Sequence, residues 1–214
     1  MSEKDSGIYN AMNKGVQHAN GVYVQFLNSG DWLSSCSILE RVFSHDFTED
    51  IIYCNISLYE ESVYKRTQKY PKVIGIDFFL NSALGHNSCF AKTNLLRQHP
   101  FDESLRIVSD WKFFLQSVID GASFRYYDNC VGCFDMSGIS STMPDIVSRE
   151  RREVIAGLLP VVFDYKMWQT AIVSSFLSNV YLDEFIVMCT KSKLLKKVIT
   201  ATVVLMKNRC AKKL

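Results

Sequence analysis

The sequence lacks any long hydrophobic run, which bears on where the protein works. No apolar stretch in its 214 residues approaches the roughly eighteen that a membrane-spanning helix requires. The first residues, Met-Ser-Glu-Lys-Asp, lack the apolar segment of a secretory signal peptide. We therefore expect a cytoplasmic protein.

Internal repeats, low-complexity linkers and a regular cysteine pattern are also missing. The seven cysteines are odd in number and irregularly spaced, which favours reduced thiols over a disulfide framework. Apolar residues make up 48% of the chain and aromatic residues 13%, which excludes disorder and allows a sizeable core. We therefore predict one globular domain with an appendage.

Acidic residues are absent after Glu184, where eight Lys and Arg residues occur. Since the whole chain carries +2, the part before them carries 2 − 8 = −6. In residues 191–214 the lysines alternate with Leu, Ile, Val and Met, a pattern typical of a basic amphipathic helix. We predict that this tail binds an anionic membrane surface as a peripheral protein on the inner face, at about 1 kcal/mol per basic residue.

The acidic body of the protein and nucleic acid are two other partners for a basic tail. Packing of the tail against the acidic surface of the body is the alternative to membrane binding. Nucleic acid is a poorer choice of partner, because aromatic residues do not alternate with the basic ones, and we predict no nucleic-acid binding.

The hydrophobic pattern predicts an α/β domain followed by helices. The apolar run 22–27 is typical of a strand in a sheet that is covered on both faces. Helices are predicted at 8–18, 37–43, 76–81, 109–120, 145–159, 165–190 and 192–207, and strands at 22–27, 50–59, 62–66, 86–90 and 123–133. The predicted domains are 1–143 and a helical C-terminal extension, 144–214.

Three blocks of polar and aromatic residues occur before residue 142. The first is residues 3–33, with Asn-Lys-Gly at 13–15 and Asn-Ser-Gly-Asp at 28–31. The second comprises Gly-His-Asn-Ser-Cys-Phe at 85–90 and the aspartate-containing segment 101–114, and the third is Phe-Asp-Met-Ser-Gly-Ile-Ser-Ser at 134–141. In this order the blocks resemble glycosyltransferase family 2, which has the GT-A fold and includes bacterial polysaccharide and colanic-acid-type transferases.

The resemblance implies a GT-A-like mixed sheet that lacks its N-terminal part, about sixty residues or two β-α units. It also implies inverting transfer of a hexosyl or related unit from a nucleotide-sugar donor to a saccharide or lipid-linked acceptor, in surface polysaccharide biosynthesis at the cell envelope. The alternative is a non-catalytic remnant or partner subunit that binds an acceptor or another transferase. Loss of the first strands would leave residues 22–27 as an open apolar edge, which predicts a homo-oligomer or a complex with a partner transferase.

By the resemblance, the first block binds the donor. The donor-binding residues it implies are Asp5, Tyr9, Asn13, Lys14 and Asn28. Asp31, at the end of the strand, would bind Mg²⁺ or Mn²⁺, which prefer oxygen ligands. The family motif has more than one carboxylate here, whereas this chain has Asp31 alone, and a helix- or turn-capping role is the alternative.

The second block implies the acceptor side. Inverting transfer requires removal of a proton from the acceptor hydroxyl, and Asp110 matches the position of the family's base. The alternative is an aspartate that is favoured at a helix N-terminus by the macrodipole, with Ser109 as the more natural cap. His86 and Trp111 are assigned to the acceptor side, although such residues often belong to the core.

A zinc site is disfavoured. His86 and Cys89, with Cys130 and Cys133, have the local spacing of zinc ligands. The last two cysteines, three residues apart on a predicted strand, would project to opposite faces. We therefore predict no zinc.

Overall fold

A mixed six-stranded sheet organises the part of the chain that the structure, a computed structural model, describes: residues 3–159. The strand order is β1-β5-β3-β6-β2, and β4 pairs with β3 outside this path. The strands are β1 (Tyr23–Val24), β2 (Trp32–Leu33), β3 (Ile51–Glu60), β4 (Val63–Gln68), β5 (Cys89–Lys92) and β6 (Phe124–Asp135). Only the β3–β6 pair is parallel.

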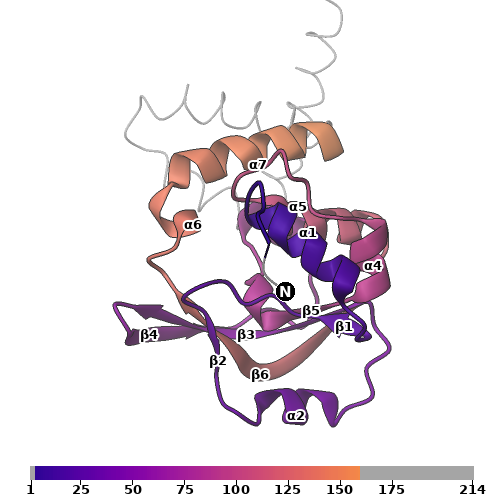
Figure 1. Ribbon diagram of the computed structural model, residues 1–214, viewed down its shortest axis with the longest axis vertical. Helices are drawn as coiled ribbons and strands as arrows, with labels where there is room; N and C mark the ends of the chain where they lie inside the picture. The colour runs from indigo at the N-terminus through magenta and orange to yellow at the C-terminus, as the bar shows by residue number, and fades with distance from the viewer. Residues whose placement is uncertain (1–2, 160–214) are drawn as a thin grey trace, which may run out of the picture. The chain divides into compact units, whose positions relative to one another are not determined.

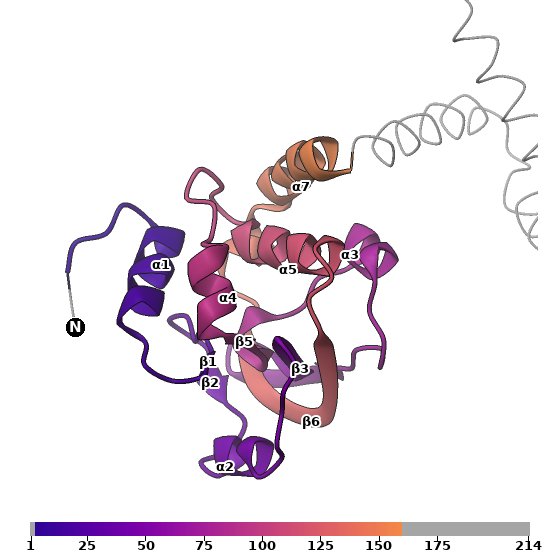
Figure 2. The same cartoon turned by 90° about the vertical axis from the view of Figure 1, so that its right-hand side faces the viewer.

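Helices cover this sheet unequally on its two faces. They are α1 (Ile8–His18), α2 (Ile38–Phe43), α3 (Ile76–Asn81), α4 (Thr93–Gln98), α5 (Ser109–Ile119), α6 (Ile139–Thr142) and α7 (Pro144–Leu158), with the 3₁₀ turn η1 (His86–Ser88). Helices α1, α4, α5 and α7 lie on one side of the sheet and α2 on the other (Figures 1 and 2). The predicted mixed α/β architecture is confirmed.

Strand β3 runs through the centre of the sheet and the core. Its residues from Ile51 to Leu58 are all buried, as expected of a mostly apolar strand between neighbours on both sides. A cluster below the sheet joins Ile52 to Ile38 and Val42 of α2 and to Val131 of β6, all four without exposed surface. Fully burying such side chains contributes about 1.5–3 kcal/mol each.

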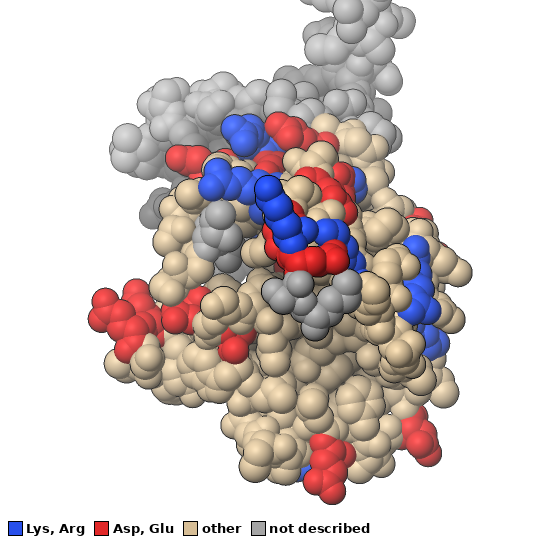
Figure 3. Space-filling model, in the orientation of Figure 1, with Lys and Arg blue, Asp and Glu red and all other residues tan. Residues whose placement is uncertain are grey.

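The predicted hairpin at residues 50–66 is confirmed as β3 and β4. Glu60 pairs with Val63 across a two-residue turn in which Glu61 and Ser62 have φ of 50° and 64°. A turn with positive φ at both positions matches the twist of the flanking strands. Acidic side chains gather on the surface at the hairpin tip, whereas both charge signs occur over the helical layer (Figure 3).

The prediction of a buried strand at 22–27 is wrong in length and burial. Only Tyr23 and Val24 form a strand, at the sheet edge, paired with β5. Gln25 then donates a hydrogen bond to the Asn87 carbonyl (2.6 Å), and Phe26 packs edge-on against Phe101. These contacts direct the chain out of the sheet after Val24. The apolar run 22–27 therefore forms a short, half-buried edge strand and not the central strand that its composition predicted.

Three local predictions are also corrected. His86 begins a 3₁₀ turn, and β5 starts only at Cys89. Asp31 lies in the turn before β2, where its N–H donates to the Asn28 carbonyl (3.0 Å). Val108 is the N-cap of α5, and the Ser109 hydroxyl is buried without a partner among the described residues.

Helix α7 confirms the helix predicted at 145–159, and it belongs to the compact unit that ends at Leu158. The predicted domain boundary at 143 and 144 therefore falls before α7, whereas the compact unit includes it. The helices predicted at 165–190 and 192–207, and the basic tail, lie outside the described residues. None of the helices within residues 3–159 has the length and apolar character needed to cross a bilayer.

Candidate active site

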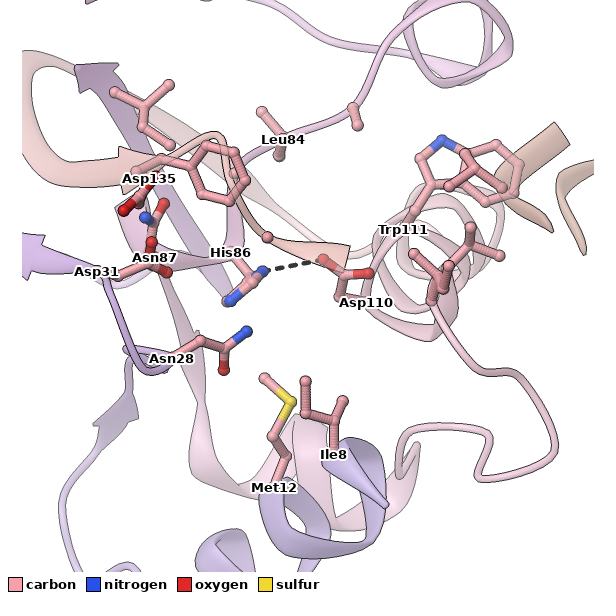
Figure 4. Close-up of a pocket in the computed structure, with 18 of the residues that line it drawn as sticks. Ile8, Met12, Asn28, Asp31, Leu84, His86, Asn87, Asp110, Trp111 and Asp135 are labelled. Carbon is pink, nitrogen blue, oxygen red and sulfur yellow. Dashed lines mark hydrogen bonds and ion pairs between the residues drawn. The ribbon is translucent and has the colours of Figure 1, made fainter. Parts of the chain in front are cut away.

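A cavity of about 540 Å³ opens between α1, η1, α5 and α7, at one end of the sheet. Small-molecule sites commonly occupy about 300–1,000 Å³. Figure 4 shows polar side chains in this cavity from segments far apart in the sequence. Its polar and charged lining includes Tyr9, Asn28, Asp31, His86, Asn87, Arg106, Asp110, Asp135 and Arg151.

His86 and Asp110 face one another at the centre of the cavity (Figure 4). The His86 Nδ1 lies 3.0 Å from the Asp110 Oδ2, and their side chains are 15% and 17% exposed. The His86 Nε2 is buried without a hydrogen-bond partner among the described residues. The ring therefore keeps one nitrogen for a ligand while Asp110 holds the other.

The pair shifts both pKa values in opposite directions. Burial alone would lower the pKa of His86, but the hydrogen bond and charge of Asp110 raise it above its usual 6.5. Burial alone would raise the pKa of Asp110, but the hydrogen bond and charge of His86 lower it below its usual 3.8. The aspartate is therefore ionised at neutral pH, the state that a proton acceptor requires.

Tyr9 of α1 completes this network. Its hydroxyl lies 3.1 Å from the Asp110 Oδ1 and contacts the Ile107 carbonyl, so one proton can serve either acceptor. Burial, and then the charge of Asp110, raise the pKa of Tyr9. The hydroxyl therefore stays protonated and orients the carboxylate.

Glu150 of α7 secures the loop that precedes α5. Its buried carboxylate accepts hydrogen bonds from the backbone N–H groups of Arg106 (2.8 Å), Ile107 (3.0 Å) and Val108 (3.2 Å). A carboxylate that accepts several backbone N–H groups makes strong, charge-assisted bonds. Because α5 begins directly after this loop, Glu150 helps to set the position of Asp110.

The opposite end of the cavity is rich in oxygen atoms. Asn28, Asp31, Asn87 and Asp135 gather there, across His86 from Asp110 (Figure 4). Gly30, with φ of 95°, turns the chain beside Asp135, and a Cβ at Gly30 would lie 3.7 Å from the Asp135 Cβ. The turn thus places Asp31 near a second carboxylate that is distant in sequence.

Gly132 lets β6 pass close to η1. A Cβ there would lie 2.6 Å from the Asn87 carbonyl oxygen and 2.6 Å from the Ser88 hydroxyl. The Gly132 N–H instead donates to that hydroxyl at 2.9 Å. A side chain at this position would push η1, and with it His86, out of place.

The oxygen-rich end suits a divalent cation. Asp31 Oδ2 and Asn87 Oδ1 are both buried without a hydrogen-bond partner among the described residues, and such oxygens are the ligands that Mg²⁺ and Mn²⁺ prefer. Burial raises the pKa of Asp31 above its usual value, although the positive charge of His86 acts in the opposite direction. Residues 3–159 contain no group of three His, Cys, Asp or Glu side chains arranged for a metal, so any ion would also need amide, water or ligand oxygens.

Three of the predicted donor-binding residues lie outside the cavity. Asp5 accepts a hydrogen bond from the Gly7 N–H (3.1 Å) ahead of α1. Asn13 bonds to both the N–H and the carbonyl of Phe101 at 2.9 Å, so it fastens α1 to the body. Lys14 forms an exposed ion pair with Glu3 at 2.9 Å. The structure brings the other predicted residues, Tyr9, Asn28, Asp31, His86, Asp110 and Trp111, together in one cavity.

Trp111 lines the cavity as a largely buried residue. It is 2% exposed, and its indole N–H points to the carbonyls of Phe79 and Ser82, each at 3.1 Å. The Arg151 guanidinium lies 5.0 Å from its ring centroid. The ring is therefore covered on one side by a cation and contributes chiefly shape to the cavity.

Several polar residues of the site were not predicted from the sequence, among them Asn87, Asp135, Arg106 and Arg151. Asn87 and Asp135 lie inside segments 85–90 and 134–141, so their position in those blocks was a usable signal. Arg106 lies inside segment 101–114 and shared that signal. Arg151 gave none, because it sits in the run Arg-Glu-Arg-Arg-Glu at 149–153, which is typical of a solvated helix face.

Two sequence relatives carry the same description. Proteins described as "PGL/p-HBAD biosynthesis glycosyltransferase", from Mycobacterium bovis and Mycobacterium tuberculosis, are 25% identical to this chain over 151 residues. The match covers 67% of this chain and 57% of each relative. The chain thus spans little more than half the length of these curated relatives. No family model matches the sequence.

A solved structure supports the fold. The crystal structure of TarS 1–349 from S. aureus is similar with a TM-score of 0.51 and 14% identity, over 73% of this chain and 46% of that chain. This likeness confirms the predicted GT-A-like mixed α/β fold. At this identity it shows the fold alone, whereas the mycobacterial relatives show homology to glycosyltransferases.

Proposed function

We propose that this protein is an inverting family 2 glycosyltransferase. It would transfer a hexosyl or related unit from a nucleotide-sugar donor to a saccharide or lipid-linked acceptor in surface polysaccharide biosynthesis. The homology to glycosyltransferases and the GT-A-like fold support the general class. The cavity supports the roles of individual residues.

One observation carries the proposal: an ionised, oriented carboxylate and an oxygen-rich pocket share one cavity. Asp110, held by Tyr9 and His86, would take the proton of the acceptor hydroxyl as that oxygen attacks the anomeric carbon. The bond from the anomeric carbon to the diphosphate breaks as the new glycosidic bond forms. His86, between Asp110 and Asp31, would place its free Nε2 toward the reacting groups.

The donor diphosphate would lie at the oxygen-rich end. Asp31, Asn87 and Asp135 would hold a Mg²⁺ or Mn²⁺ ion there, and Asn28 would contact the donor. When bound, such an ion offsets the negative charge of the leaving diphosphate. Asn87 and Asp135 would supply the oxygens that the single carboxylate of the 28–31 segment lacks.

Donor hydrolysis tests the proposal without knowledge of the acceptor. The chain would be incubated with a panel of nucleotide sugars, with and without Mn²⁺, and released nucleoside diphosphate would be measured. We expect slow release from one donor, lost in Asp110→Asn or Asp31→Asn. Release from no donor, or release by both variants at the wild-type rate, would contradict a catalytic role for this cavity.

A non-catalytic partner subunit is the rival function. It would bind an acceptor or another transferase and would need neither an ionised Asp110 nor a cation. Two results together would favour this rival: the wild type turns over no donor, and Asp110→Asn leaves acceptor binding unchanged.

The basic tail would bring the protein to the cytoplasmic face of a membrane. Its residues 191–214 would bind anionic lipids, and salt would weaken the contact by screening. Co-sedimentation with anionic and neutral vesicles, before and after deletion of 191–214, tests this role. Unchanged binding after the deletion would place the membrane contact elsewhere.

A further inference from the structure

Arg151 lines the cavity beside Trp111, at the end away from Asp31. It projects from α7, a helix outside the three sequence blocks that resemble the family. Its Nε is buried and makes no hydrogen bond with any described residue. A guanidinium in such a place offers several N–H donors in a fixed plane.

Arg151 is partly buried, and withdrawing a cation from water is costly unless an anion compensates it. Burial lowers the pKa of Arg151, and the negative charge of Asp110 acts against this shift. Both oxygens of Asp110 already have partners, however, since Oδ1 lies near the Tyr9 hydroxyl and Oδ2 near His86. The negative charge of Asp110 thus stabilises the Arg151 cation electrostatically, without a direct hydrogen bond between them.

The other acidic group near Arg151 is engaged as well. Glu150, its neighbour on α7, directs its carboxylate to three backbone N–H groups of the loop before α5. One of these belongs to Arg106, which lines the same cavity. Glu150 therefore fastens the segment that carries Arg106 to the helix that carries Arg151, and it leaves both guanidinium groups available.

We propose that Arg151 and Arg106 bind an anionic group, a carboxylate or phosphate, on the acceptor. The proposal rests on the proposed function, because it assigns the Asp110 end of the cavity to the acceptor. Arginine binds carboxylate and phosphate oxygens through paired N–H donors. The donor diphosphate would occupy the Asp31 end, across His86, so the two arginines would serve the acceptor.

This arrangement gives the anion a positioning role. An acceptor held at the arginines would present a hydroxyl to Asp110 in a restricted set of orientations. A neutral acceptor of the same size would lack this anchor. The site therefore predicts selectivity for acidic acceptors.

Binding of three sugar probes to the full chain tests the inference. Methyl glucuronide carries a carboxylate, glucose 6-phosphate carries a phosphate, and methyl glucoside is neutral. By calorimetry we expect one anionic probe to bind about tenfold or more tightly than the neutral probe, with the preferred anion identifying the group. Arg151→Gln should remove the preference, and Arg151→Lys should retain part of it.

Arg152→Gln is the matched control, because Arg152 is the exposed neighbour on α7 and should leave the preference unchanged. Arg106→Gln, at an exposed position, tests the site without changing a buried residue. Equal binding of charged and neutral probes by the wild type, or a preference that survives both Arg151→Gln and Arg106→Gln, would overturn the inference. An anion preference that depends on Arg151 in a chain without donor turnover would support the site and refute the transferase.

Discussion

The His86 Nδ1 and the Asp110 Oδ2 lie 3.0 Å apart in a largely buried pair. Each residue comes from a different element, η1 and α5, and each stabilises the charged form of the other. The pair keeps Asp110 ionised and fixes the His86 ring.

Asp110→Asn should lower the turnover number on the order of 10² or more, because the amide keeps size and hydrogen bonding but cannot accept the proton. Donor affinity should stay near the wild-type value, since the change affects the transition state rather than donor binding. Steady-state transfer and donor titration check both points. Asp120→Asn, at the exposed C-cap of the same helix, should be neutral. Undiminished transfer by Asp110→Asn would remove Asp110 from the mechanism.

The stability contribution of the His86–Asp110 pair should depend on pH with a defined sign. The pKa of His86 is raised from 6.5, so its stabilisation is complete below 6.5 and is lost as pH rises through the folded-state pKa. The pKa of Asp110 is lowered from 3.8, so its stabilisation is complete above 3.8 and is lost as pH falls through its folded-state pKa. The pair should therefore stabilise the folded protein most between pH 3.8 and pH 6.5.

Urea unfolding of the wild type and of His86→Asn checks this pH dependence. The difference between their free energies of unfolding should be larger at about pH 5.5 than at about pH 9. His45→Asn is the control, because His45 is exposed and outside the cavity. A difference that grows toward high pH would contradict the assigned direction.

Mn²⁺ binding should depend on the oxygen-rich end of the cavity. Asp31→Asn removes the carboxylate that we propose as a ligand, so Mn²⁺ affinity measured by electron paramagnetic resonance should fall about tenfold or more. Asp135→Asn should weaken binding in the same direction, and exposed Asp46→Asn should have no effect. For nucleoside diphosphate binding, the losses from chelator and from Asp31→Asn should be less than additive, because both remove one interaction. Full additivity would assign Asp31 a structural role in the turn.

Glu150→Gln should destabilise the fold by about 1–3 kcal/mol. The substitution removes the charge that binds three backbone N–H groups, and a buried donor without its partner costs about this much. Glu153→Gln on the same helix should change stability by less than about 0.5 kcal/mol, since its side chain is 62% exposed. Chemical denaturation compares the two variants. Equal stabilities would show that Glu150 does not secure the loop.

The sequence alone was sufficient for the elements whose signals are local. Helix α1, the β3–β4 hairpin and helix α5 follow from patterns of neighbouring residues, and the structure has them close to the predicted bounds. Asp31, His86 and Asp110 were identified because each lies in a short block whose residue types and order are distinctive. The structure brings these three residues together in one cavity.

Only the tertiary structure decided which polar side chains reach the cavity. Asn13 and Lys14 have the right chemistry for a diphosphate, yet Phe101 and Glu3 engage them elsewhere. Glu150 and Arg151 look like members of a solvated helix face, yet packing of α7 against α5 buries Glu150 beside the loop and the Nε of Arg151 beside the cavity. The reason is physical: a side chain's burial and partners depend on segments that fold next to it, and those segments lie too far along the chain for a local pattern to reveal them.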